Sequence, residues 1–345
     1  MTMTTARAKS NGLPDLDLSA PLLEVSGLQV EFRTRVGNAH AVNGVSFSLE
    51  PGETLAILGE SGSGKSVTAQ AIMGILDTPP GYVTGGQVRY RGVDLLKLPE
   101  QQRRKFRANN IAMVFQDALS ALNPVFTVGF QLAEQFRMHR GTSRAEGYKR
   151  AVELMDLVKI PAAAERVKNY PHQFSGGMRQ RVMIAMSLAL DPDILIADEP
   201  TTALDVTVQA QIMKLLAELQ RERHMGLILI THDMGVIANV ADRIAVMYAG
   251  RIVETAPVRE IYAKPSHPYT KALLESVPRV DQKGHELSVI KGLPPTLTRI
   301  PDGCAFNPRC RYAQDVCRQP PPPPLYDVNG EHTSACHFWE EVRGQ

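Results

Sequence analysis

The chain has 345 residues, of which 43% are hydrophobic and 21% are charged, a mixture typical of a folded globular protein. Lysine and arginine number 38 and aspartate and glutamate 36, so the formal net charge of +2 gives no electrostatic case for binding nucleic acid or an anionic membrane. No apolar run reaches the roughly 18 residues of a membrane span, and residues 1–20 lack the apolar core of a secretory signal. We therefore expect a cytosolic chain with a disordered tail over residues 1–20.

The order of predicted elements indicates an α/β fold. Leu22 to Leu58 alternates apolar and polar residues as strands do, and its last four residues form a wholly apolar run typical of a strand buried on both faces. Strands that alternate with helices then indicate a parallel sheet covered on both sides. Further along, we expect a helix over Val67–Ile75, β-structure at Gly86–Tyr90, a mainly helical block from about Asp117 to Leu190, strands at Ile194–Ala197 and Leu227–Ile230, a helix over Val206–Arg223, and one β-stretch over Ala245–Val253.

The glycine-rich segment GESGSGKS follows the predicted buried strand, opens a predicted helix and fits the pattern G-x-x-x-x-G-K-[ST]. Glycines let consecutive backbone N–H groups turn inward, which makes a concave anion site beside the partial positive charge of a helix N-terminus. In such a loop the lysine reaches the β- and γ-phosphates, and the following hydroxyl binds Mg²⁺. The segment predicts a nucleoside triphosphate site formed by Gly59, Ser61, Gly62, Ser63, Gly64, Lys65 and Ser66.

Two adjacent carboxylates, Asp198 and Glu199, end the apolar run Ile194–Ala197. Neighbouring side chains of a strand point to opposite faces, so two consecutive acids do not both belong to a routine surface. Asp198 fits support of Mg²⁺ through water, and Glu199 fits the group that orients and deprotonates an attacking water. The alternative is a strand end with merely solvated acids, which the phosphate loop makes the weaker interpretation.

Four more segments, in this order along the chain, resemble motifs of the ATP-binding subunits of ABC transporters, and the resemblance spans about Leu22 to Pro265. They are Val114–Asp117 (the Q-loop), Ser175–Arg181 (the signature motif SGGMRQR), Thr202–Asp205 (the D-loop) and Thr231–Asp233 (the switch histidine). The resemblance implies an ABC domain over residues 21–267. Its P-loop NTPase core would have a parallel or mixed sheet, an N-terminal antiparallel β subdomain, and a helical signature subdomain at about 117–190.

The resemblance also implies roles and partners. Gln116 would contact Mg²⁺ and the attacking water, which gives Ser66, Gln116 and Asp198 as the magnesium set and Glu199, His232 and Gln116 as the catalytic set. Two ATPase subunits would face head to tail, each presenting signature and D-loop residues to the other's ATP: Ser175, Gly176, Gly177, Gln180 and Asp205. The further partners would be two transmembrane permeases and an extracytoplasmic solute-binding protein. The second ATPase is expected to be a non-identical homologue, and the assembly to lie on the cytoplasmic face of the cell membrane.

The segment expected to hold adenine departs from that family. An aromatic residue often stacks on adenine shortly before the strand expected at Ala41–Leu49, whereas Thr34–His40 contains no Tyr, Phe or Trp. Phe32 and His40 are the nearest substitutes, and the sequence does not choose between them.

Residues 268–345 form a loop-rich extension. The segment that spans its start, Ser266–Lys271 (SHPYTK), resembles the C-terminal region of oligopeptide, dipeptide and related nickel importers. All four cysteines lie here: Cys304, Cys310, Cys317 and Cys336. Their spacing is wider than the tight pairs of structural zinc sites and suits loops around a larger object. The family implies one [4Fe–4S] cluster, with zinc, free thiols or a disulfide as alternatives. A mainly structural role is expected, because a small extension with little core gains stability from a metal.

The predicted function is an ATPase subunit of a membrane importer, most simply for dipeptides or oligopeptides. An importer of nickel or another small solute is the alternative. A soluble ABC ATPase acting on nucleic acid or ribosomes is disfavoured, because the chain has neither tandem nucleotide domains nor strongly basic segments. The sequence does not identify the transported solute, the homo- or heterodimeric nature of the ATPase pair, the metal centre or the adenine-stacking residue.

Overall fold

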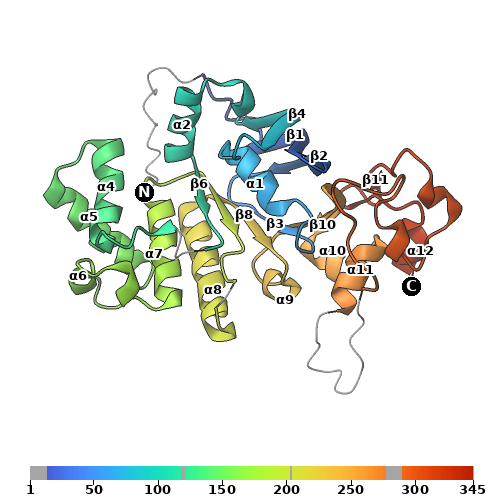
Figure 1. The fold of residues 1–345 in the computed structure, drawn as a ribbon. Coiled ribbons are helices and arrows are strands. Elements are labelled where there is room, and N and C mark those ends of the chain that lie inside the picture. Colours follow the sequence, from blue (N-terminus) through green and yellow to red (C-terminus); the bar gives the residue numbers. More distant parts are fainter. Residues whose placement is uncertain (1–13, 118–120, 203, 277–289, 345) are drawn as a thin grey trace.

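The computed structural model describes residues 14–117, 121–202, 204–276 and 290–344. Most of the tail expected at residues 1–20, and Ala203 of the expected D-loop, lie outside these ranges. Two sheets organise the chain (Figure 1). The smaller is antiparallel with the order β2-β1-β4-β5. Its strands are β1 (Leu23–Thr34), β2 (Gly37–Leu49), β4 (Gly81–Tyr90) and β5 (Val93–Asp94).

The larger, eight-stranded sheet has the order β11-β12-β10-β9-β3-β8-β7-β6. The neighbours from β6 to β9 run parallel, and β10, β12 and β11 add antiparallel pairs at one edge. The strands are β3 (Thr54–Leu58), β6 (Ile111–Val114), β7 (Ile194–Asp198), β8 (Gly226–Thr231), β9 (Arg243–Tyr248), β10 (Arg251–Pro257), β11 (Tyr326–Asp327) and β12 (Thr333–Ser334). The expected α/β class with a mixed sheet and an antiparallel N-terminal part is confirmed.

Some helices flank the large sheet. Helices α4 to α7 form a separate group beside it (Figure 1). The α-helices are α1 (Lys65–Met73), α2 (Glu100–Asn109), α4 (Val128–Arg140), α5 (Arg144–Leu157), α6 (Ala163–Arg166), α7 (Gly176–Leu188), α8 (Val206–Arg223), α9 (Met234–Ile237), α10 (Val258–Ala263), α11 (Pro268–Glu275) and α12 (Trp339–Gly344). Short 3₁₀ turns lie at Leu95–Lys97, Pro171–Gln173, Asn307–Arg309 and Asp315–Arg318.

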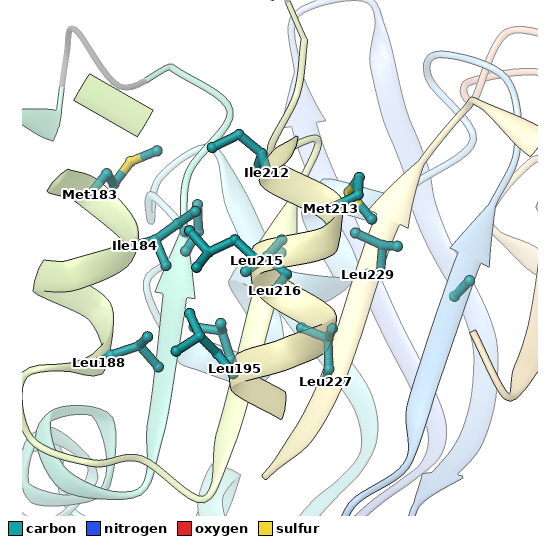
Figure 2. Close-up of a cluster of buried hydrophobic side chains, with 14 of the residues drawn as sticks. Met183, Ile184, Leu188, Leu195, Ile212, Met213, Leu215, Leu216, Leu227 and Leu229 are labelled. Atoms are coloured by element: carbon teal, nitrogen blue, oxygen red, sulfur yellow. The ribbon is translucent and has the colours of Figure 1, made fainter. Parts of the chain in front are cut away.

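The central strands are buried on both faces, as their apolar runs predict. Leu227 and Leu229 of β8 belong to one hydrophobic cluster, whereas Ile228 and Ile230 belong to a second cluster on the opposite face. Figure 2 shows the first face, where side chains of α7 and α8 pack against β7 and β8. Both faces of these strands are therefore covered, which leaves their carboxyl-terminal edge to carry polar groups.

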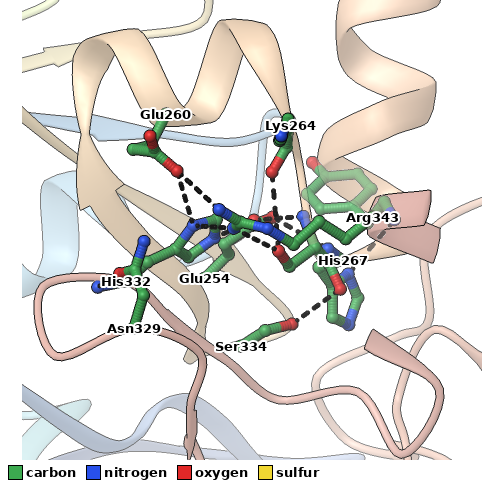
Figure 3. Close-up of polar contacts among 10 residues, drawn as sticks. Glu254, Glu260, Lys264, His267, Asn329, His332, Ser334 and Arg343 are labelled. Atoms are coloured by element: carbon green, nitrogen blue, oxygen red, sulfur yellow. Dashed lines mark hydrogen bonds and ion pairs between the residues drawn. The ribbon is translucent and has the colours of Figure 1, made fainter. Parts of the chain in front are cut away.

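The C-terminal extension is joined to the rest of the chain through the large sheet. Ser334 of β12 pairs with Glu254 of β10, a side chain with no exposed surface. Glu254 accepts hydrogen bonds from the backbone N–H groups of Ser266 and His267, at 2.5 and 3.0 Å, and lies 2.7 Å from Nε2 of His332 (Figure 3). Arg343 of α12 lies 2.8 Å from Nδ1 of His332. Because arginine only donates, Nδ1 accepts, and the imidazole proton on Nε2 is directed at Glu254.

The predicted single β-stretch at Ala245–Val253 is wrong in one respect. It is a hairpin, β9 and β10, that turns at Ala249 and Gly250, both with positive φ. Both strands are mostly buried and apolar, so only Gly250 and Arg251 mark the turn, an interruption too short to separate two strands in the sequence pattern. Several elements were not predicted, among them α2 and β6 in the core and the short elements α9, α10, α11, α12, β5, β11 and β12. Helix α2 is rich in charged and amide side chains, and β6 has only four residues.

Candidate functional site

Helix α1, the loop before it and the ends of several strands enclose a cavity of about 630 Å³, a size within the range of small-molecule sites. Most of the predicted phosphate-loop residues line it, together with Gln116, Glu199 and His232. The residues that line this cavity therefore come from widely separated parts of the chain, between positions 32 and 297. The full lining consists of Phe32, Ala41, Glu60, Ser61, Gly62, Gly64, Lys65, Ser66, Val67, Gln116, Glu199, His232 and Leu297.

The phosphate loop requires glycine at two positions for steric reasons. Gly64 has φ +103°, and a Cβ there would lie 2.2 Å from the carbonyl oxygen of Ala41. A Cβ on Gly59 would lie 2.2 Å from the carbonyl oxygen of Met247. Both distances are far inside van der Waals contact, so the loop between β3 and α1 keeps this path only without side chains at these positions.

Lys65 lies at the base of the loop with only 5% of its surface exposed. Its Nζ donates to the carbonyl oxygens of Gly59 and Glu60 at 2.7 and 3.0 Å. Burial lowers the pKa of Lys65, while the charges of Glu199, Asp198 and Glu60 act in the opposite direction. A buried ammonium satisfied by neutral carbonyls is a strong donor that an anionic ligand can engage.

The Ser66 hydroxyl donates to Oδ1 of Asp198 at 2.9 Å, which brings together two members of the expected magnesium set. Asp198 is 5% exposed, and burial raises its pKa. Hydroxyl and carboxylate oxygens are the ligand types that Mg²⁺ prefers, and the ion is normally completed by substrate phosphates and water. The donor set therefore fits Mg²⁺ bound with a triphosphate.

Glu199, just beyond β7, is the centre of a convergent group. Its φ of +45° is uncommon for a non-glycine residue and is fixed in part by a 2.9 Å hydrogen bond from its N–H to the carbonyl of Ile230. Gln116 Nε2 and Thr202 Oγ1 donate to Oε2 of Glu199 at 3.0 and 2.9 Å, and Nδ1 of His232 lies 3.4 Å from Oε1. The hydrogen bond from Thr202 was not expected from the sequence.

The signature residues lie elsewhere. Ser175 caps α7 by accepting from the N–H of Met178, and Ser175 and Gly176 are exposed. Asp205 caps α8 in the same way through Val208, and a Cβ on Gly177 would lie 2.6 Å from that valine. None of these residues lines the cavity described above. Gln180 is 4% exposed, so it faces the interior in this structure.

The extension contacts the phosphate loop directly, which sequence reasoning missed. Arg309 donates through both terminal nitrogens to the carboxylate of Glu60, at 2.6 and 2.9 Å. The hydroxyl of Tyr269 accepts from the backbone N–H of Glu60 at 2.8 Å. Tyr269 belongs to the expected His-Pro-Tyr segment, so that segment contributes a contact to the nucleotide loop.

The four cysteines line a second cavity, together with His267. Burial raises the pKa of Cys304 to about 11 and that of Cys336 to about 12, and it raises the pKa of Cys310 as well. Among the residues that the structure describes, no group of three or more His, Cys, Asp or Glu side chains has the arrangement of a metal-ion site. The arrangement of these side chains therefore does not support the expected iron–sulfur cluster.

Comparison with known proteins follows the same division of the chain. The family described as "ABC transporter" matches residues 42–202, and the family described as "Oligopeptide/dipeptide transporter, C-terminal region" matches residues 253–317. The oligopeptide transport ATP-binding protein OppD of Salmonella typhimurium is 53% identical over 301 residues, which cover 87% of this chain and 89% of that protein. The chain belongs to the ABC transporter family. It is an ABC ATPase, and this confirms the family and the enzyme class expected from its motifs.

Two further relatives support this assignment of the ABC ATPase. OppD of Bacillus subtilis is 52% identical over 312 residues, covering 90% of this chain and 87% of that protein. Among solved structures, a dimeric ATP-binding cassette in a post-hydrolysis state with ADP and Pi matches with a TM-score of 0.62 and 29% identity, over 69% of this chain and 99% of the cassette. In the described ranges, no helix combines the length and the apolar character of a membrane span.

Proposed function

We propose that this ABC ATPase is the ATP-hydrolysing subunit of an importer for oligopeptides or dipeptides, held at the cytoplasmic face of a membrane by two permease subunits. The observation that carries the proposal is the match of both parts of the chain: the ABC domain and the C-terminal region named for oligopeptide and dipeptide transporters. The two OppD relatives match over 89% and 87% of their own length, so the similarity includes both of these parts.

In the proposed mechanism, Lys65 shifts its hydrogen bonds from the loop carbonyls to the phosphates of ATP. Ser66 and Asp198 would hold Mg²⁺, which when bound would neutralise charge on the phosphates. Glu199 accepts a proton from the attacking water. Gln116 and His232 orient that carboxylate and the water, which is supported by their positions at 3.0 and 3.4 Å from its two oxygens.

The proposed ATP site is completed by a second ATPase subunit. Ser175 and Gly176 lie at an exposed helix N-terminus outside the cavity, so they are available to ATP held by a partner. The dimeric cassette with ADP and Pi supports this arrangement by similarity. Gln180, buried in this structure, would act by positioning the start of α7 rather than by reaching the partner's ATP.

Gentle solubilisation of native membranes with a tagged chain tests the proposed assembly. We expect two polytopic permeases and a homologous, non-identical ATPase to co-purify. In liposomes, the purified complex should hydrolyse ATP faster when its solute-binding protein is loaded with a peptide than when that protein is empty. Stimulation by nickel or another solute but not by peptides would overturn the peptide assignment. Recovery only in the soluble fraction with ribosomal or DNA-bound proteins would overturn the importer.

We also propose that the four cysteines hold one [4Fe–4S] cluster. Support comes from two observations: all four thiols line a single cavity, and the buried Nε2 of His267, beside them, has no hydrogen-bond partner among the described residues. Burial lowers the pKa of His267 to about 3, so this ring is neutral and its Nε2 is free to donate to a sulfur. A [4Fe–4S] cluster is held by four thiolates, which is the number of cysteines that line this cavity.

Metal analysis of protein purified without oxygen tests the centre. We expect about four iron atoms and four sulfides per chain and a broad visible absorbance, and Cys304→Ser should remove both. The extension of the variant should be cleaved by proteases faster than that of the wild type, because the cluster links loops that have little hydrophobic core of their own. One zinc per chain without sulfide would replace the cluster by the zinc alternative, and the absence of any metal would leave thiols or a disulfide.

A further inference from the structure

The ATPase cavity has an apolar end that the phosphate chemistry does not use. Lys65, Ser66 and Glu199 mark the end of the lining that suits phosphates and Mg²⁺. Apart from Val67 of α1, the apolar side chains of the lining are Phe32 of β1, Ala41 of β2 and Leu297 of the C-terminal extension. The carbonyl of Ala41 lies directly beside Gly64 of the phosphate loop, so this apolar wall adjoins the phosphate site.

The backbone of the extension fixes Leu297 at this wall. The carbonyl of Leu297 accepts a 2.9 Å hydrogen bond from the N–H of His40, in β2. The segment that leads to Leu297 is also held, because Nε of Arg309 donates to the carbonyl of Lys291 at 3.3 Å while the same guanidinium binds Glu60 of the phosphate loop. Arg309 is 4% exposed, so these contacts form a buried link between the extension and the loop.

The alternatives left open by the sequence are now distinguished. His40 is exposed and does not line the cavity, whereas Phe32 lines it and packs against the core of the small sheet. The hairpin between β1 and β2 supplies no other aromatic residue, since Thr34–Gly37 is exposed and contains none. The wall therefore depends on one aromatic side chain and on a leucine contributed by the extension.

We propose that Leu297 of the C-terminal extension contacts the nucleobase of ATP beside the expected aromatic position at Phe32, so that the extension is part of the nucleotide site. The inference rests on the proposed binding of the triphosphate at the phosphate loop. A purine has two apolar faces and no net charge, which matches a wall of aromatic and aliphatic side chains next to a polar loop. The extension thereby determines affinity for the base, while the loop determines affinity for the phosphates.

Binding of two probes to the full-length protein separates these contributions: Mg·ATP, and Mg²⁺ with inorganic tripolyphosphate, which has no base. In the wild type, Mg·ATP should bind more tightly than tripolyphosphate. Leu297→Ala should weaken Mg·ATP by about fivefold, as expected for losing a partly buried aliphatic side chain, and leave tripolyphosphate unchanged. Leu297→Met should restore most of the ATP affinity. The matched control is Leu293→Ala in the same segment, where 89% of the leucine is exposed; neither affinity should change.

The possible results are distinguishable. If the wild type binds neither probe, the proposed triphosphate site fails, and the base contact fails with it. If Leu297→Ala weakens both probes equally, the leucine stabilises the loop and not the base, which would overturn the inference while the proposed function stands. Unchanged ATP affinity in Leu297→Ala would also overturn the inference. Circular dichroism of each variant shows that the fold is retained, since the His40 hydrogen bond uses only the backbone of Leu297.

Discussion

Glu199→Gln is expected to lower the rate of ATP hydrolysis by about a hundredfold to ten-thousandfold, the contribution of a positioned general base. The amide keeps the shape of the carboxylate but cannot take a proton from water. Gln116 and Thr202 both donate to the same carboxylate oxygen, at 3.0 and 2.9 Å, so the side chain is held for this role. ATP binding should be retained, because Lys65 and Ser66 are unchanged, and the variant should accumulate as an ATP-bound closed dimer.

Single-turnover hydrolysis and size-exclusion chromatography with Mg·ATP measure both effects. The matched control is Glu222→Gln, an exposed carboxylate near the end of α8, which should hydrolyse ATP at the wild-type rate. If Glu199→Gln keeps most of its activity, the proton acceptor is another group, and the contacts around Glu199 serve only to hold the strand end.

The parts of the site that are predictable from the sequence are those with a local chemical pattern. The phosphate loop is contiguous, and the spacing of its glycines reflects two close approaches to backbone carbonyls, at Ala41 and Met247. Asp198 and Glu199 are recognisable because a buried strand ends in two acids. Gln116 and His232 are weak signals alone, and the order of the family motifs singles them out. The structure then brings both to Glu199.

The contributions of the extension were not predictable, for a physical reason. Arg309 and Glu60 are 249 residues apart in the sequence, and an arginine among loop residues carries no mark of its partner. Leu297 is held by its main chain, so its side-chain type gives no signal of the hydrogen bond to His40. The cysteines attract attention in the sequence, whereas the residues that couple the extension to the nucleotide site lie between and before them.

Secondary-structure elements were likewise predicted where a local pattern marks them and missed where none does. Buried strands such as β3 and β8 are visible as short apolar runs, because both their faces are covered. The amphipathic helix α8 was predicted with its observed bounds, Val206–Arg223. Helix α2 was missed, because in EQQRRKFRAN only Phe106 is a large apolar residue, and one anchor does not make a periodic pattern.

Lys65→Ala is expected to weaken the binding of Mg·ATP by about tenfold to a hundredfold, the loss of one charged hydrogen bond to a phosphate. The electrostatic reason extends beyond that bond. Burial lowers the pKa of Lys65, and the charges of Glu199, Asp198 and Glu60 oppose that shift, so these carboxylates act on the site that the triphosphate enters. Without the ammonium, these carboxylates would repel the phosphates with less compensation.

Isothermal titration with Mg·ATP, at low and at moderate salt, measures this loss. The free energy of unfolding should not fall, because the substitution also removes the cost of burying the charge of Lys65. Lys97→Ala is the matched control, since this lysine is 72% exposed and pairs only at the surface with Asp94. Comparison with Leu297→Ala separates the phosphate contacts from the base contact. Lys65→Ala should lower the affinity for both ATP and tripolyphosphate, whereas Leu297→Ala should lower the affinity for ATP alone. Equal ATP affinity in Lys65→Ala and the wild type would contradict the assignment of the phosphate loop itself.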